Sequence, residues 1–501
     1  MFALLLATIT ACNQDSGSRE LPELPPLPPL LAERASTAGP ERPIRELIVA
    51  LTGSVRGEVE VCGCPTTPYG GFERRGVLYG QLRSHGVPTF AVDAGEMLVK
   101  GLTARDEVDR RLRAEAVLDL AAAAGLDAWA ASPLDLPPGG PAFLQEHGAL
   151  SANWVPEGGA PLAAARVVEH EGVRLGVIGL SDLPGADDPD GAVRAVTAAM
   201  TEPVDLWVAL SNASEAVNRA VAEGVPGLGA VLATQGESHD EPLATHGAPI
   251  IEVAARGRYV SVLHLTLGTD SRPVELVNRG VWKDVALARG RLASAGEGAA
   301  VVGAELERDA ARLPGLTTGR NVAFVESVPL DAGYAPTDRG SGVSARLEGF
   351  RQSVLSSAAA ASARPAPEGG YATGSSCAGC HSDRMASWGF DAHAHAMASL
   401  IHRDAQTNPE CVACHSTGFG RPGGFAELKP ERVEAFRDVQ CEACHGPMAG
   451  HDGRGGKSSA PVTEATCRTC HDEANSPKFD YGAYRSQLSC VRVSGQSEPD
   501  R

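Results

Sequence analysis

The sequence predicts an α/β domain followed by a separate segment that is organised around one repeated motif. In the first half, short apolar and β-branched runs such as ELIVALTG and VRLGVIGL alternate with longer stretches of helical pattern. Strands that alternate with helices are typical of an α/β layered fold. In the last quarter, Cys-x-x-Cys-His occurs four times. A chain of 501 residues is long enough for two or three domains.

The N-terminus predicts export. An apolar run leads into Ile-Thr-Ala-Cys, which ends at Cys12 and resembles a bacterial lipobox. Such a signal is cut before the cysteine, and acyl chains on Cys12 would then anchor the protein. An ordinary signal peptide is the alternative, because no Lys or Arg precedes the run. The run is too short to span a bilayer. We expect a membrane-anchored lipoprotein on the periplasmic or cell-surface side.

Composition divides the rest of the chain. A Pro-rich stretch follows the signal, and a segment rich in Ala, Arg, Glu and Leu separates the α/β domain from the motifs. The predicted parts are the signal 1–12, a linker 13–44, the α/β domain 45–285, a helical connector and linker 286–370, the motif segment 371–490 and a tail 491–501. The net charge of −18 argues against a nucleic-acid partner.

The repeated motif is the attachment site of a c-type haem. Its two thiols bond to the haem vinyl groups, and the adjacent His is placed to coordinate the iron. Zinc is the alternative, but the directly following His, the long gaps between motifs and the export signal favour haem. We expect four covalently bound haem c groups. The attachment residues are Cys377, Cys380, Cys411, Cys414, Cys441, Cys444, Cys467 and Cys470, and the proximal iron ligands are His381, His415, His445 and His471.

The motif segment is poor in large aliphatic side chains, so it cannot build an ordinary core. Four macrocycles would supply the missing apolar volume and would lie close together. Four further histidines of the segment are candidates for the distal iron positions: His393, His395, His402 and His451. If residues 392–402 form one helix, His393 and His395 point about 200° apart and serve different haems.

The flanking sequences SWGFDAHAHAMASLIH, CVACHSTGFGRPGGF and VQCEACHGPMAGH resemble a tetrahaem cytochrome family whose best-known member accepts electrons from hydroxylamine oxidoreductase. The resemblance implies a mainly α multihaem domain with mostly bis-His coordination. It favours His393 and His451 as distal ligands. Cys490 stands about where the family continues to another His. One haem is therefore left five-coordinate, bound by Cys490 thiolate, or completed by His395 or His402.

The α/β region, from IVALTGSVRGEVEV to VPGLGAVLATQGE, resembles the 5′-nucleotidase-like metallophosphoesterases. The resemblance implies a layered sandwich with two metals that activate water. The family's ligand positions have changed here, and Glu96 alone keeps a strong ligand type. The replaced positions read Ser54-Val55-Arg56-Gly57, Gly95-Glu96, Pro133-Leu134, Asn212 and Gln235. We expect the fold without the phosphoesterase chemistry.

These features together predict an exported electron-transfer protein with no assigned catalytic residue. The expected partners are redox proteins or quinol-linked electron donors, and the membrane through the anchor. The sandwich could dock a partner, bind a ligand or space the haems. A multihaem oxidoreductase acting on a small nitrogen or sulfur compound is one alternative, and a phosphohydrolase with an appended cytochrome is another. Cys62 and Cys64 have no assigned role.

Overall fold

The chain divides into two compact units. A computed structural model describes residues 45–492 apart from 62–67, 85, 99–106, 137–139, 158–159, 184–185, 187, 235–244, 254, 269–273, 277–320, 339, 341, 367–368, 404, 452–460, 472–475 and 477. Cys12, Cys62, Cys64 and the predicted signal and linker lie outside these residues. The first unit comprises Met1–Glu96, Ala121–Pro133 and Leu144–Arg339, and the second comprises Met97–Leu120, Leu134–Phe143 and Gly340–Arg501. The described part of the chain contains no helix long and apolar enough to cross a membrane.

Two β-sheets form the centre of the first unit. The six-stranded sheet has the order β10 (Glu275–Leu276), β11 (Val322–Pro329), β9 (Tyr259–Leu267), β1 (Arg45–Thr52), β2 (Thr89–Asp93) and β3 (Ala128–Trp129). The five-stranded sheet has the order β4 (Ala165–His170), β5 (Val173–Leu180), β6 (Leu206–Ser211), β7 (Leu228–Ala233) and β8 (Ile250–Glu252). Neighbouring strands from β5 to β8 are parallel, as are β1 and β2.

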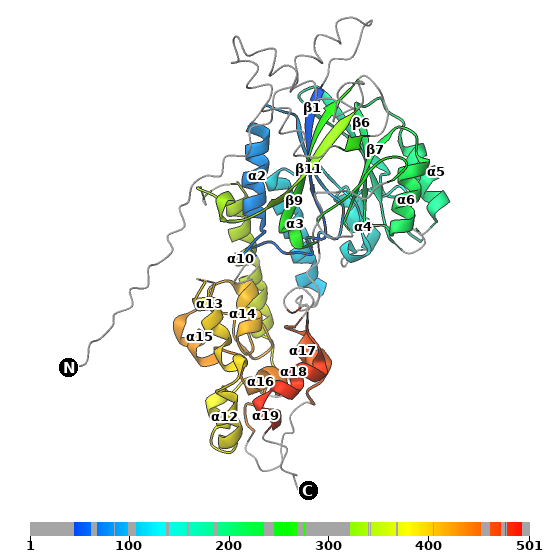
Figure 1. Ribbon diagram of the computed structural model, residues 1–501. Helices are drawn as coiled ribbons and strands as arrows, with labels where there is room; N and C mark the ends of the chain where they lie inside the picture. Colours follow the sequence, from blue (N-terminus) through cyan, green and yellow to red (C-terminus); the bar gives the residue numbers. More distant parts are fainter. Residues whose placement is uncertain are drawn as a thin grey trace, which may run out of the picture. The chain divides into compact units, whose positions relative to one another are not determined.

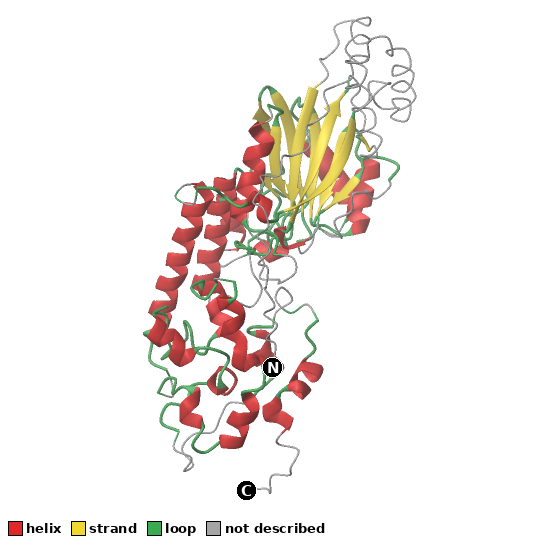
Figure 2. Cartoon of the chain, turned by 60° about the vertical axis from the view of Figure 1, so that its left-hand side comes forward, coloured by secondary structure: helices red, strands yellow, loops and turns green. Residues whose placement is uncertain are grey.

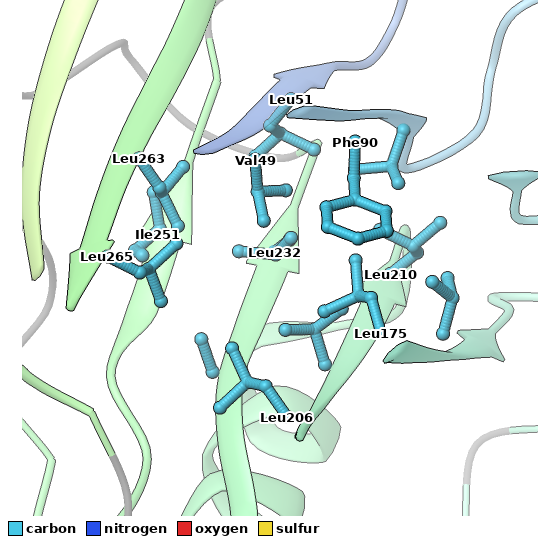
Figure 3. Packing of buried hydrophobic residues seen from close by; sticks show 14 of the residues in the cluster. Val49, Leu51, Phe90, Leu175, Leu206, Leu210, Leu232, Ile251, Leu263 and Leu265 are labelled. Atoms are coloured by element: carbon cyan, nitrogen blue, oxygen red, sulfur yellow. The ribbon is translucent and has the colours of Figure 1, made fainter. Parts of the chain in front are cut away.

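The facing sides of the two sheets pack against each other. Alternate residues of β1 and β2, such as Val49, Leu51 and Phe90, meet Leu175 and Leu210 of the other sheet (Figure 3). Alternation places every second side chain on one face, so this pattern fills the space between the sheets.

The outer faces carry helices. Helices α5 (Pro189–Ala199) and α6 (Glu215–Gly224) lie beside the second sheet in Figure 1. Val196 of α5 and Val217 of α6 belong to the same buried cluster as Ile178 and Val231 of this sheet. Helix α2 (Phe72–Ser84) packs against β2 of the first sheet. Both faces of central strands such as β2, β6 and β7 are therefore buried, which explains why their sequences are continuously apolar. The predicted α/β layered sandwich is confirmed.

The expectation of a purely helical connector over 286–370 is wrong for part of that segment. Val322–Pro329 is strand β11, which pairs antiparallel with β9. The run Val-Ala-Phe-Val has the β-branched and aromatic character that suits a sheet. Helix α10 (Gly342–Ser362) follows and extends into the stretch that was predicted as linker, because its end is rich in Ala, the best helix former.

The second unit is helical among its described residues, and beyond residue 371 it consists of short helices and loops. Helices are red and loops green in Figure 2. Helix α3 (Glu107–Ala124), up to Leu120, and α10 also belong to it. The short helices and turns are α11 (Gly374–Cys377), α12 (Ser382–Trp388), η5 (Ala392–His395), α13 (Ala396–Ile401), α14 (Pro409–His415), α15 (Pro430–Phe436), α16 (Cys441–His445), α17 (Glu464–Arg468), α18 (Tyr481–Gln487) and α19 (Ser489–Arg492). The mainly α character of this segment is confirmed.

The apolar cluster of the second unit is small. It joins Ala358 of α10 to side chains of α13, α14 and α15 and to the loop phenylalanines Phe419 and Phe425. Among their described residues, α12, α17 and α18 bury no side chain. These helices adjoin the first and fourth motifs, so the residues that flank those motifs supply little core of their own. This pattern fits the expectation that haem fills the interior of the segment.

Candidate haem-binding site

Each motif places its two thiols and its His on one turn of backbone. The second motif ends helix α14, and the third forms α16. In the first and fourth motifs the N–H of the His donates to the carbonyl of the first cysteine, at 2.9 Å in His381 and in His471. Residues three and four positions apart lie on the same side of a helical turn. The local geometry therefore suits one haem at each motif.

The first, third and fourth motifs converge. The Cys377 and Cys441 thiols are hydrogen-bonded, and burial followed by this contact raises the pKa of Cys377 to about 11. Burial, then the neighbouring thiols of Cys467, Cys490 and Cys470, raise the pKa of Cys444 to about 11. The three motifs are far apart in the chain, so tertiary structure brings them together.

Glu442 ties the first motif to the third. It stands between the two cysteines of the third motif and is 2% exposed. Its carboxylate accepts from the backbone N–H groups of Ala372 at 2.9 Å, Thr373 at 3.1 Å and Met448 at 2.7 Å. The side chain of Gln440 accepts from Gly374, the first residue of α11, at 2.6 Å. Sequence reasoning missed Glu442, although an acidic residue inside the motif was visible.

His393 and the fourth motif's His471 face each other, with ring centroids 6.0 Å apart and planes inclined by 59°. Two imidazoles that bind opposite sides of one metal, at bonds of about 2 Å, have centroids roughly 6 Å apart. His471 Nδ1 lies 2.9 Å from the Ser476 hydroxyl, so a metal would be bound through Nε2. Burial lowers the pKa of His393 despite the nearby Asp391, which favours the neutral, ligating form. These residues fit a haem iron.

Two contacts fix the position of His393. Trp388 donates through its indole Nε1 to the carbonyl of Val439 at 3.0 Å, and the N–H of Val439 donates to the carbonyl of His393, also at 3.0 Å. Val439 lies just before the third motif. These contacts join the segment 388–393, which follows the first motif, to the backbone just before the third motif.

The imidazole ring of His415, in the second motif, is oriented by contacts of its Nδ1 atom. Nδ1 lies 2.7 Å from the carbonyl of Ala396 and 3.2 Å from the hydroxyl of Ser399. A ligating His usually donates its second ring N–H in this way, which fixes the tautomer and the ring. His415 is therefore prepared to bind iron through Nε2.

The other distal candidates lie at the surface. His395 ends η5, and its Nε2 is 3.1 Å from the carbonyl of Gly389. His402 follows α13 at its C-cap, and the backbone N–H of His451 donates to Met448 at 2.9 Å. Residues 392–402 are a 3₁₀ turn followed by a short α-helix, so the angular argument from one continuous helix does not apply. All three histidines stay candidates.

Cys490 lies beside the third motif, on helix α19. The Ser489 hydroxyl holds this helix by donating to Asp391 at 2.6 Å and to the carbonyl of Ser387 at 2.8 Å. Burial, followed by the charge of Asp391, raises the pKa of Cys490. A raised pKa disfavours the thiolate, which is the metal-binding form.

In the sandwich, the residues at the expected metal-ligand positions bind one another. The Ser54 hydroxyl and the Arg56 Nη2 donate to Glu96 Oε2 at 2.8 and 3.0 Å. All three residues have left-handed backbone, with φ of 48°, 52° and 57°. Such strained conformations often persist at functional sites. A guanidinium thus neutralises the carboxylate, and the described residues include no cluster of three His, Cys, Asp or Glu side chains placed to hold a metal.

Asn212 joins the two sheets. Its amide nitrogen donates to the carbonyls of Ala94 at 3.2 Å and Ala131 at 2.8 Å, and its oxygen accepts from the N–H of Asp182 at 3.0 Å. A Cβ on Gly95 would lie 2.5 Å from this amide nitrogen, so the approach requires glycine. Pro133 and Leu134 lie in the turn η1 (Pro133–Asp135), and Gln235 is outside the described residues.

Comparison with known proteins separates the two parts of the chain. Residues 376–446 match the family Cytochrome c554 and c-prime. Cytochrome c-554 of Nitrosomonas europaea is 33% identical over 138 residues, which cover 25% of this chain and 57% of that protein. The chain thus spans little more than half the length of the curated relative it matches. Its last quarter contains a cytochrome c-554-like segment, with the covalently bound haem c that this class implies.

Solved structures similar to the chain include a 5′-nucleotidase precursor from Thermus thermophilus, with a TM-score of 0.43, 17% identity and coverage of 62% of this chain and 59% of that one. The sulfate thiohydrolase SoxB of Thermus thermophilus has the same score at 14% identity, with coverage of 62% and 61%. The calcineurin-like phosphoesterase YfkN of Bacillus subtilis scores 0.41 at 15% identity, with coverage of 62% and 98%.

Proposed function

We propose that this chain is an exported tetrahaem c-type cytochrome that carries electrons between redox partners, and that its sandwich no longer hydrolyses phosphoesters. The observation that carries the proposal is the convergence of three haem motifs within one small helical unit. The Cys377–Cys441 contact and the neighbourhood of Cys444 and Cys467 would hold the attached haems side by side. Each bound haem supplies a one-electron ferric/ferrous couple, and closely spaced couples pass electrons readily.

The protein's own residues hold and orient these groups. His393 and His471 would together hold one iron, and the coordination of that iron would then be complete. The Ala396 carbonyl turns His415 so that Nε2 is free to ligate. Saturated coordination favours electron transfer over chemistry on a bound substrate. This arrangement supports a carrier rather than an oxidoreductase at the fourth haem.

The sandwich is proposed to be catalytically inactive. A two-metal hydrolase needs several anionic or imidazole ligands that converge on both ions. Here the Arg56 guanidinium forms an ion pair with Glu96. The side-chain amide of Asn212 is hydrogen-bonded to backbone groups near both sheets. We assign the unit a docking or spacing role. Its partners are then redox proteins or quinol-linked donors, met on the periplasmic or cell-surface side where Cys12 anchors the chain.

One preparation of the exported protein tests the proposal. Haem staining after denaturing electrophoresis should be positive, because thioether bonds survive denaturation, and the intact mass should exceed the mature polypeptide by the mass of four haems, one for each motif. A colourless protein that carries zinc would refute the proposal.

Two further measurements on this preparation decide between the alternatives. A spectral change when carbon monoxide is added to the reduced protein would reveal an open iron and favour the oxidoreductase. Metal-dependent release of phosphate from a nucleotide would favour the phosphohydrolase. The proposal expects at most one responding haem and no release of phosphate.

A further inference from the structure

A buried ion triad joins helix α3 to helix α14, which carries the second haem motif. Asp109 and Arg113 lie one turn apart on α3, and Glu410 lies in the first turn of α14. Their side chains are 1%, 9% and 10% exposed. Arg113 Nε donates to Asp109 Oδ2 at 3.0 Å, and Arg113 Nη1 donates to Glu410 Oε2. All three residues belong to the second unit.

The triad is a costly way to hold two helices together. Taking a charged group out of water has a large free-energy cost. Well-packed apolar residues can often replace such groups without lowering the stability of the protein. The triad also carries two negative charges and one positive charge. Within the described residues, Glu410 Oε1 is buried and has no hydrogen-bond partner. Two buried carboxylates thus contact one guanidinium, and the burial of Glu410 on the attachment helix points to a role for its charge.

Glu410 lies on the helix that carries the second attachment motif. It directly precedes Cys411, on the helix that also carries Cys414 and His415. The backbone N–H of Glu410 donates to the side chain of Asn408, the N-cap of this helix, at 2.9 Å. The carboxylate is thus held by Arg113 on one side and by the attachment helix on the other.

We propose that Glu410, held in place by Arg113, lowers the reduction potential of the haem attached to Cys411 and Cys414. The inference rests on the proposed function. Ferric haem carries one more positive charge than ferrous haem, so a buried anion nearby favours the ferric form. Reduction adds one electron, taken from a donor protein or, in a titration, from dithionite. Glu410 acts as a positioned charge and not as a ligand.

The cation of this triad lies outside the segment that matches the cytochrome family. The match to Cytochrome c554 and c-prime covers residues 376–446, which include Glu410 but not Arg113. The cation that holds Glu410 comes from a helix almost 300 residues upstream. A haem segment without α3 would have to place Glu410 in another way.

Potentiometric titration of the full-length holoprotein, followed by its visible spectrum, tests the proposal. In Glu410→Gln the midpoint of one haem should rise while the other midpoints stay unchanged. A Cys411→Ala/Cys414→Ala variant, which lacks the second haem, identifies the transition concerned. Arg113→Lys keeps the cation and should keep the midpoint near the wild-type value. Glu434→Gln is the matched control, because it removes an exposed carboxylate from the same unit and should shift nothing.

The sign of the shift separates charge from structure. If Glu410→Gln merely loosened α14, water would reach the haem and favour the ferric form, so the midpoint would fall. A fall, or an unchanged midpoint with all haems present, overturns the proposal. If Glu410→Gln loses the second haem, Asp109→Asn removes the other negative charge of the triad. It should raise the same midpoint, and an unchanged or lowered value there refutes the idea. A wild-type protein without haem would instead refute the proposed function.

Discussion

At the scale of single residues, the side chains of the second unit are the proposed ligands of the haem irons. His393 and His471 come together although they are 78 positions apart in the sequence, and Phe479 stacks on His471 at 5.0 Å with an interplanar angle of 10°. The stacked ring and the Ser476 hydroxyl restrict rotation of the imidazole. A ligand whose orientation is set in advance loses less entropy on binding the metal.

Replacing His393 by Ala should convert one haem to the high-spin state, because the fourth iron would lose its distal ligand. Electron paramagnetic resonance of the oxidised protein measures this change. His246→Ala, an exposed histidine of the first unit, is the control and should leave the spectrum unchanged. A His393→Ala protein with all its haems in the low-spin state would show that another residue is the ligand.

Short helical elements carry the attachment chemistry, and buried polar side chains hold these elements in register. Helices α11 and α16 are too short to be stable alone, since isolated helices shorter than about 12 residues are marginal in water. Glu442 compensates because its carboxylate accepts hydrogen bonds from two segments. These are the residues just before the first motif and the loop after α16. The same carboxylate thus positions two haem attachment sites.

Glu442→Gln should therefore lower the free energy of unfolding by about 1–3 kcal/mol, because the amide cannot satisfy all these backbone donors. Guanidinium unfolding of the holoprotein, followed by circular dichroism, measures the change. Glu431→Gln, at an exposed position of α15, should stay within about 0.5 kcal/mol of wild type. Equal stability of the Glu442→Gln and Glu431→Gln variants would show that Glu442 does not stabilise the packing of the first motif against the third.

For the molecule as a whole, the chain combines a two-sheet sandwich with a haem segment and is predicted to be tethered at its N-terminus. The excess of acidic residues gives a net charge of −18. Such a charge repels nucleic acids and favours encounter with basic surfaces at low ionic strength.

Replacing Cys12 by Ser should move the protein from the membrane fraction to the soluble fraction, since the attachment point of the acyl chains is gone. Fractionation of cells, followed by haem staining, measures the distribution. Cys490→Ser is the matched control, because it removes a cysteine that is not predicted to be acylated, and it should stay with the membrane. A Cys12→Ser protein that remains in the membrane fraction would contradict the lipobox assignment.

Much of the architecture could be predicted because it depends on local patterns. Continuous apolar runs identified central strands of the sandwich such as β1 and β5, but β9 and β11 were missed. Val322–Pro329 follows a stretch with helix-forming composition. The loss of the usual metal ligands was visible in Ser54 and Arg56. The pairing of Arg56 with Glu96 was not, because it joins residues 40 positions apart.

The sequence by itself determined the chemistry of the haem motifs, because the two thiols and the His of one motif lie within a single turn and need no tertiary contact to face the same way. Only the tertiary structure decided which motifs are neighbours, which histidine faces His471, and that α3 brings Arg113 to Glu410. The physical reason is the separation along the chain of the residues that interact. Attachment geometry follows from backbone spacing, whereas distal ligation and buried charge depend on side chains that folding brings together from distant parts of the chain.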